Sequence, residues 1–78
     1  MVPRVKHIRP SDDYVLHVTF DNGITKLYDM KSKLTESRYA LLVDKIIFKM
    51  VKIDCGGYGI SWNDQVDMSE NELWIHGR

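Results

Sequence analysis

Residues 14–29 read YVLHVTFDNGITKLYD, two alternating apolar runs that meet at Asn22-Gly23. An Asn-Gly pair between two such runs is the strongest short-range signal for a β-hairpin, because both residues tolerate the positive φ angles of a two-residue turn. A loop of this length pairs Val18 with Leu27, and residues that pair across two strands share one face of the sheet. The segment therefore predicts a hairpin whose buried face consists of Leu16, Val18, Phe20 and Leu27.

The opposite face of this hairpin has a mixed character. In the same register it carries His17, Lys26 and Tyr28. We expect a helix, a partner or water to cover this face.

The sequence on either side of the hairpin predicts one further strand and one helix. Residues 5–8 are typical of a short strand, which Pro10 ends. After the hairpin, Thr35 or Ser37 can cap a helix. The helix is expected to span about ten residues, too few to be stable without tertiary packing. Its apolar residues recur at helical spacing: Tyr39, Leu42 and Val43.

The C-terminal half of the chain predicts a second hairpin. Residues 48–53 are strand-like, and residues 54–57 contain paired glycines, which form turns at low steric cost. Residues 58–62 then alternate large and small side chains. One face of this last strand is therefore nearly bare, which favours the close approach of another segment.

Residues 1–78 are predicted to form a single α+β domain. Ser69 and Glu72 make a capping box at the start of a last helix, and Gly77 ends it. The elements follow in the order strand, hairpin, helix, hairpin and short C-terminal helix. This order gives a mainly antiparallel sheet of about five strands.

Charge and cysteine content narrow the classes of function. Eleven Lys and Arg balance eleven Asp and Glu, whereas proteins that bind nucleic acid usually carry a net basic field. We therefore do not expect direct binding to nucleic acid. Cys55 is the single cysteine, which excludes an internal disulfide, and no apolar run approaches the roughly 18 residues of a membrane helix. A cytoplasmic protein is expected.

The candidate chemical groups do not form a catalytic or metal-binding pattern. His7, His17 and His76 lack the spacing of metal ligands, and the sequence shows no base that would activate the thiol of Cys55. We predict no catalytic, cofactor-binding or metal-binding residue, and so no enzyme. A pocket that gathered His17 or Cys55 with a carboxylate would favour a small enzyme instead.

Three aromatic residues near the end of the chain are candidates for an interface. Tyr58, Trp62 and Trp74 belong to residue types that are enriched at the centres of protein interfaces. The alternative is that they fill the core, which a domain of this size needs. Both interpretations, interface and core, hold if a second chain completes one face of the sheet.

Several segments of the chain together carry a family resemblance. They are residues 16–23, residues 28–30, Phe48, Val51 and, most specifically, residues 60–74, ISWNDQVDMSENELW. In these segments the chain resembles the bacterial family called domain of unknown function 2442. The resemblance implies a small α+β fold in a cytoplasmic protein. The family has no accepted catalytic residues, so the resemblance assigns none here.

Two hypotheses of function remain open. The first is a non-enzymatic protein-interaction module whose partner is a second copy of the chain or a small protein. Some relatives are encoded beside a second small protein, and the resemblance therefore implies an antitoxin-like role. The second is a ligand-sensing or regulatory domain of a transcription-related system, because other relatives carry a helix-turn-helix segment. This second hypothesis predicts a pocket lined by Tyr58, Trp62 or Trp74.

Overall fold

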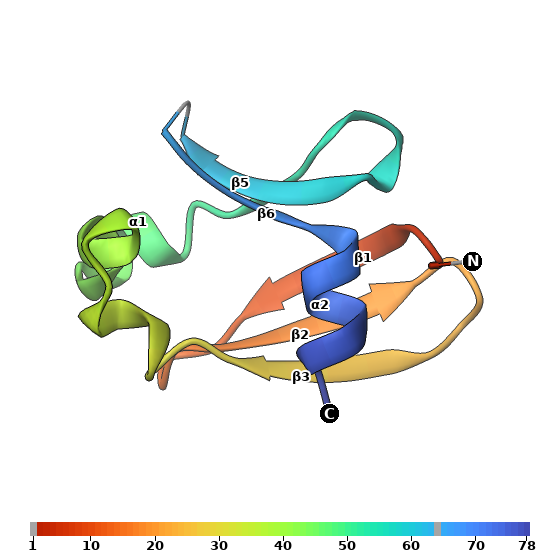
Figure 1. Cartoon of the computed structure of the whole chain (residues 1–78), viewed down its shortest axis with the longest axis horizontal. Helices are drawn as coiled ribbons and strands as arrows, with labels where there is room; N and C mark the ends of the chain where they lie inside the picture. The colour runs from red at the N-terminus through yellow and green to blue at the C-terminus, as the bar shows by residue number, and fades with distance from the viewer. Residues whose placement is uncertain (1, 64) are drawn as a thin grey trace.

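Two antiparallel sheets and a set of short helices make up the fold. A computed structural model of the chain describes residues 2–63 and 65–78. Within these residues each sheet has three strands, in the orders β1-β2-β3 and β4-β5-β6. In Figure 1 the β5–β6 hairpin lies above the first sheet, α2 lies in front between the two, and α1 lies at one end with its neighbouring turns. The predicted α+β class is confirmed, with six strands instead of about five.

The first sheet contains the hairpin that the Asn-Gly signal predicts. Its strands are β1 (Val5–Pro10), β2 (Val15–Phe20) and β3 (Thr25–Asp29). Three of the four residues assigned to its buried face are fully buried: Leu16, Val18 and Phe20. The fourth assignment is wrong, because the side chain of Leu27 is 44% exposed and its place on this face is taken by Tyr28.

The length of the hairpin loop explains this error. The backbone N–H of Phe20 donates to the carbonyl of Ile24, so the loop is Asp21-Asn22-Gly23, three residues long. Gly23 has a φ of 87°, and Asn22 is not among the residues with positive φ. A two-residue type I′ turn needs positive φ at both central positions, whereas a three-residue loop needs it at one. The register therefore shifts by one residue, and every side chain of β3 changes face.

The second sheet contains β4 (Lys52–Ile53), β5 (Gly59–Asn63) and β6 (Val66–Ser69). Before β5, η3 (Cys55–Gly57) forms the predicted turn, with positive φ at Gly56 and Gly57. A close approach to β1 occurs at the turn itself, before the strand for which the sequence predicted one. An ideal Cβ on Gly57 would lie 2.6 Å from the carbonyl oxygen of Val5 in β1.

The segment between the two sheets differs most from its prediction. Instead of one helix of ten residues, it forms η1 (Lys33–Thr35), η2 (Ser37–Val43) and α1 (Lys45–Phe48). Tyr39 and Leu42 are buried as expected, but Val43 is exposed. The strand predicted over residues 48–53 is reduced to the two residues of β4, since Phe48 still belongs to α1.

The last helix, α2 (Glu70–His76), begins after Ser69 as predicted and is held against β3. Only the Ser69 half of the predicted capping box is seen in the described residues, because the Glu72 carboxylate binds Tyr28 and His76 instead. The side chain of Ser69 accepts from the backbone N–H of Glu72 at 3.2 Å. Lys26 of β3 reaches the other end of the helix, where its Nζ donates to the carbonyl of Trp74 at 2.6 Å. Its ammonium group also lies 4.1 Å from the centre of the Trp74 ring. The helix therefore covers the Lys26 and Tyr28 side of β3, which is the core side.

One apolar core lies between the two sheets and the central turns. It collects buried side chains from both sheets, from η2 and α1, and from α2. Its fully buried members are Leu16, Val18, Phe20, Met30, Leu42, Phe48, Ile60 and Leu73.

Candidate functional site

The three aromatic residues predicted as an interface occupy different environments. Trp62 is buried, and its Nε1 donates to the carbonyl of Phe48 at 2.9 Å. Trp74 is half-buried and packs edge-to-face on Phe20. Tyr58 is exposed, with the guanidinium of Arg4 4.1 Å from its ring centre. Core filling accounts for Trp62, so the three residues do not form one exposed cluster.

The histidines and the cysteine also lie apart. In the β1–β2 register, His7 is opposite Thr19 and His17 is opposite Arg9, so the two strand histidines do not pair. Cys55 is exposed in the η3 turn. Among residues 2–63 and 65–78, no group of three or more His, Cys, Asp or Glu side chains is placed to hold a metal ion.

An exposed apolar surface is the first notable feature that the sequence did not predict. Four large apolar side chains within ten residues are between 48% and 75% exposed. We call this set the 41–50 surface; its members are Leu41, Val43, Ile46 and Met50. They lie on η2, on α1 and just after α1, at one end of the molecule (Figure 1).

Contacts to the rest of the chain hold these turns in place. The phenol of Tyr14 donates to the carbonyl of Val43, and the side chain of Asp44 accepts from the N–H of Ile46 and so caps α1. Lys49 forms an ion pair with Asp12, which holds the pKa of that carboxyl below its usual value. The 41–50 surface is therefore presented on an ordered scaffold.

The stretch of chain that carries the 41–50 surface is mostly basic, although one of its lysines, Lys49, is paired with Asp12. Residues 38–52 contain one acidic residue, Asp44. The same stretch contains four basic residues: Arg38, Lys45, Lys49 and Lys52. A surface that is apolar at its centre and basic at its rim favours partners with an acidic rim.

The sequence does contain a signal for this surface. Residues 39–43 and 46–48 are apolar runs of five and three residues. A short helical turn can direct only part of such a run into the core. Leu42 and Phe48 become fully buried and Ile47 becomes partly buried, whereas Leu41, Val43 and Ile46 stay exposed.

A second notable feature is a hollow of about 650 Å³ beside the edge of β3. We call it the β3–α2 hollow, because β3, the turn that follows it and α2 contribute most of its lining. Its apolar lining consists of Val15, Leu27 and Tyr28. Arg78 lies at the same edge, where its backbone exchanges hydrogen bonds of 2.9 and 3.1 Å with Leu27.

A network of three side chains links β3 to α2 at this hollow. The phenol of Tyr28 donates to Oε2 of Glu72 at 2.7 Å, and Nδ1 of His76 lies 3.0 Å from the same oxygen. Burial and the Glu72 carboxylate together raise the pKa of Tyr28 far above its ordinary value of 10.0. Glu72 thus serves as a shared acceptor, and Tyr28 stays protonated at neutral pH.

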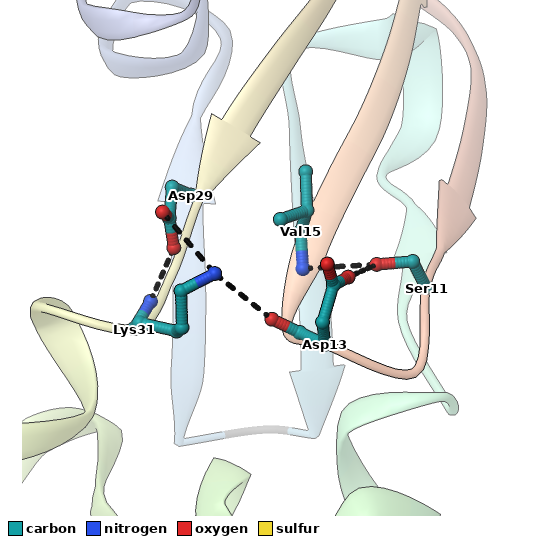
Figure 2. Close-up of polar contacts among 5 residues, drawn as sticks. All are labelled: Ser11, Asp13, Val15, Asp29 and Lys31. Atoms are coloured by element: carbon teal, nitrogen blue, oxygen red, sulfur yellow. Dashed lines mark hydrogen bonds and ion pairs between the residues drawn. The ribbon is translucent and has the colours of Figure 1, made fainter.

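A second network involves three residues of the lining, Val15, Asp29 and Lys31. Figure 2 shows Lys31 between Asp29 and the backbone of Asp13, with its Nζ 3.4 Å from the Asp29 carboxylate and 3.4 Å from the Asp13 carbonyl. The N–H of Lys31 also donates to Asp29 at 2.9 Å. The hydroxyl of Ser11 binds the Asp13 carboxylate and accepts from the N–H of Val15. These bonds fix the turn that joins β1 to β2.

Comparison with known proteins identifies the family. Residues 5–78 match the family described as a protein of unknown function, DUF2442. This chain belongs to the DUF2442 family. The match confirms the resemblance found in the sequence and covers nearly the whole chain. Comparison of this DUF2442 protein with curated proteins and with solved structures gives no match.

The helices of this DUF2442 protein are all short. None of those in the part of the chain that the structure describes is long and apolar enough to cross a membrane.

Proposed function

We propose that this DUF2442 protein is a non-enzymatic protein-interaction module and that the 41–50 surface is its binding surface. The observation that supports this proposal is the exposure of four large apolar side chains on turns held by hydrogen bonds and buried anchors. Removing apolar surface from water yields about 25 cal/mol per Å². Exposed apolar patches on ordered proteins therefore often mark binding sites. Met50 adds a flexible side chain that can adapt to a partner.

The partner that fits this surface is a second small protein with an apolar centre and an acidic rim. The basic residues around the 41–50 surface, such as Lys45 and Lys52, would meet that rim. We further propose that the partner is the product of an adjacent gene, which this chain neutralises in the cytoplasm as an antitoxin does. A second copy of the chain fits less well, because it would bring two basic rims together.

One observation favours a second candidate, a ligand-sensing or regulatory domain. The β3–α2 hollow has the size of a small-molecule site. Its lining does not include Tyr58, Trp62 or Trp74, the residues that the sequence suggested for such a pocket. A ligand-sensing role would therefore depend on the edge of β3 and on α2.

Co-purification with the product of the adjacent gene tests the proposed interaction. We expect the affinity-tagged chain to retain that product through size-exclusion chromatography. Ile46→Asp should abolish retention, because it places a charge at the centre of the 41–50 surface, where the side chain is 75% exposed and contributes little to folding. Ile75→Asp is the matched control, since Ile75 is 58% exposed on α2.

Two results would contradict the proposal. One is a wild-type chain that runs as a monomer and retains no such product. The other is a complex that survives Ile46→Asp but is lost with Ile75→Asp, because the binding surface would then lie on α2.

A further inference from the structure

The β3–α2 hollow carries an inference that is independent of the proposed interaction. Its polar lining contains two carboxylates, those of Asp29 and Glu72. Both are already engaged: Glu72 by the phenol of Tyr28 and by His76, and Asp29 by the N–H and ammonium of Lys31. The carboxylates at this site therefore already have donors within the protein.

Several hydrogen-bond donors at the hollow, in contrast, have no strong partner within the protein. In the described residues, Arg78 forms hydrogen bonds through its backbone but none through its guanidinium, and the hydroxyl of Ser32 forms none; both residues line the hollow. Lys33 lies 3.8 Å from the half-exposed Glu36, a separation at which a surface ion pair contributes little. Groups that can only donate, such as guanidinium and ammonium, bind acceptors. The unused polar capacity of the hollow thus suits an anion.

The apolar lining selects among anions. Val15 and the exposed part of Leu27 face the same hollow as Arg78 and Lys33. An inorganic ion would leave these side chains in water, whereas a ligand with an apolar body would cover them. The volume of about 650 Å³ lies within the roughly 300–1,000 Å³ of small-molecule sites.

We propose that the β3–α2 hollow binds a small organic acid, with its carboxylate between Arg78, Lys33 and Ser32 and its apolar body against Val15 and Leu27. Arg78 can form paired hydrogen bonds with a carboxylate through its planar fork. Its backbone is already fixed beside Leu27 by two hydrogen bonds, so the guanidinium starts from an anchored position. Binding would join the edge of β3 to the end of α2.

Two probes of the same shape test this proposal on the full chain. Benzoate carries an apolar ring and a carboxylate, and benzamide has the same shape without the charge. We expect benzoate to shift the backbone amide resonances of Leu27, Ser32 and Arg78 in a saturable way. Benzamide should bind at least about tenfold more weakly, a difference of about 1.4 kcal/mol.

Three variants assign the binding to its residues. Arg78→Gln and Lys33→Gln should each weaken benzoate binding by about tenfold. Arg78→Gln keeps the backbone bonds to Leu27, so the edge of β3 stays paired. Lys6→Gln is the matched control, because it removes the same charge from an exposed position of β1, outside the hollow, and should leave affinity unchanged.

Any of three results would overturn the proposal. The first is equal binding of benzoate and benzamide, and the second is an equal loss of affinity in all three variants, which would indicate a general charge effect. The third is saturable binding whose resonance shifts lie away from the hollow, or no binding at all. None of these results tests whether the 41–50 surface binds a partner, because the co-purification experiment with Ile46→Asp measures that separately.

Discussion

At the scale of single residues, two glycines with similar backbone angles are expected to differ in their tolerance of a side chain. Gly23 has a φ of 87° and open space where a Cβ would lie, whereas a Cβ on Gly57 would lie 2.6 Å from the carbonyl oxygen of Val5. Gly23→Ala should cost about 1 kcal/mol of unfolding free energy, from the positive φ alone. Gly57→Ala should cost about 3 kcal/mol, because overpacking against β1 adds to that strain.

Urea denaturation of the two variants measures this difference. Equal losses for Gly23→Ala and Gly57→Ala would show that β1 does not pack tightly on the η3 turn.

Tyr28 gives a pH dependence at the same scale. Its pKa is raised in the folded state, so the unfolded chain releases this proton first, near its ordinary value of 10.0. The stability due to Tyr28 is therefore fully present below about pH 10 and is lost progressively as the pH rises above it. We expect the wild-type chain to lose more unfolding free energy than Tyr28→Phe between about pH 9 and about pH 11.

Urea denaturation of both proteins at the two pH values tests the role of Tyr28. Other tyrosines and lysines titrate in both, so the difference between the proteins isolates this residue. Parallel losses would contradict the buried hydrogen bond from Tyr28 to Glu72.

At the scale of elements, the hairpin shows what a local signal can and cannot predict. Asn22-Gly23 correctly placed the turn and the two strands, since the alternation on both sides is strong. It did not distinguish a loop of two residues from one of three, because a glycine with positive φ satisfies either. The choice depends on which side chains of β3 meet α2, and this is a tertiary contact. The side chains of Tyr28 and Lys26 form hydrogen bonds with α2, whereas Leu27 lies on the other face of β3.

The register of this hairpin predicts that substitutions on its two faces lower the unfolding free energy by different amounts. Leu16 is fully buried, so Leu16→Ala should cost about 2–5 kcal/mol of unfolding free energy. Leu27→Thr should cost less than about 1 kcal/mol, because Leu27 is on the outer face and threonine suits a strand. Thermal or urea denaturation compares the two. A cost for Leu27→Thr as large as that for Leu16→Ala would favour the two-residue loop instead.

The turns of residues 33–48 were less predictable than the hairpin. The spacing of Tyr39 and Leu42 fits a 3₁₀ turn as well as an α-helix, since both bring residues three apart onto one face. Asp44 then interrupts the segment, because its extended backbone and its bond to the N–H of Ile46 start a new helix. The sequence thus predicted which side chains are buried better than it predicted the kind of helix. The exposure of Ile46 and Met50 could not be predicted from the sequence, because it depends on where α1 begins.

At the scale of the whole molecule, the two sheets share one core, and the two proposed binding surfaces have no residue in common. The 41–50 surface lies on η2 and α1, at the end of the molecule where Figure 1 labels α1. The β3–α2 hollow is lined mainly by residues of β3, of the turn that follows it and of α2. The two three-stranded antiparallel sheets and the short helices confirm the α+β class expected from the sequence. The candidate surfaces required the structure, because each depends on residues from elements whose register or boundaries the sequence left open.

The most direct test of the central claim is the mapping of backbone amide resonances when the product of the adjacent gene is added to this chain. The proposed function predicts that the largest changes fall on residues 41–50 and that the amides near Tyr58 and Trp74 change little. Changes centred on Tyr58 and Trp74, with residues 41–50 unaffected, would contradict it.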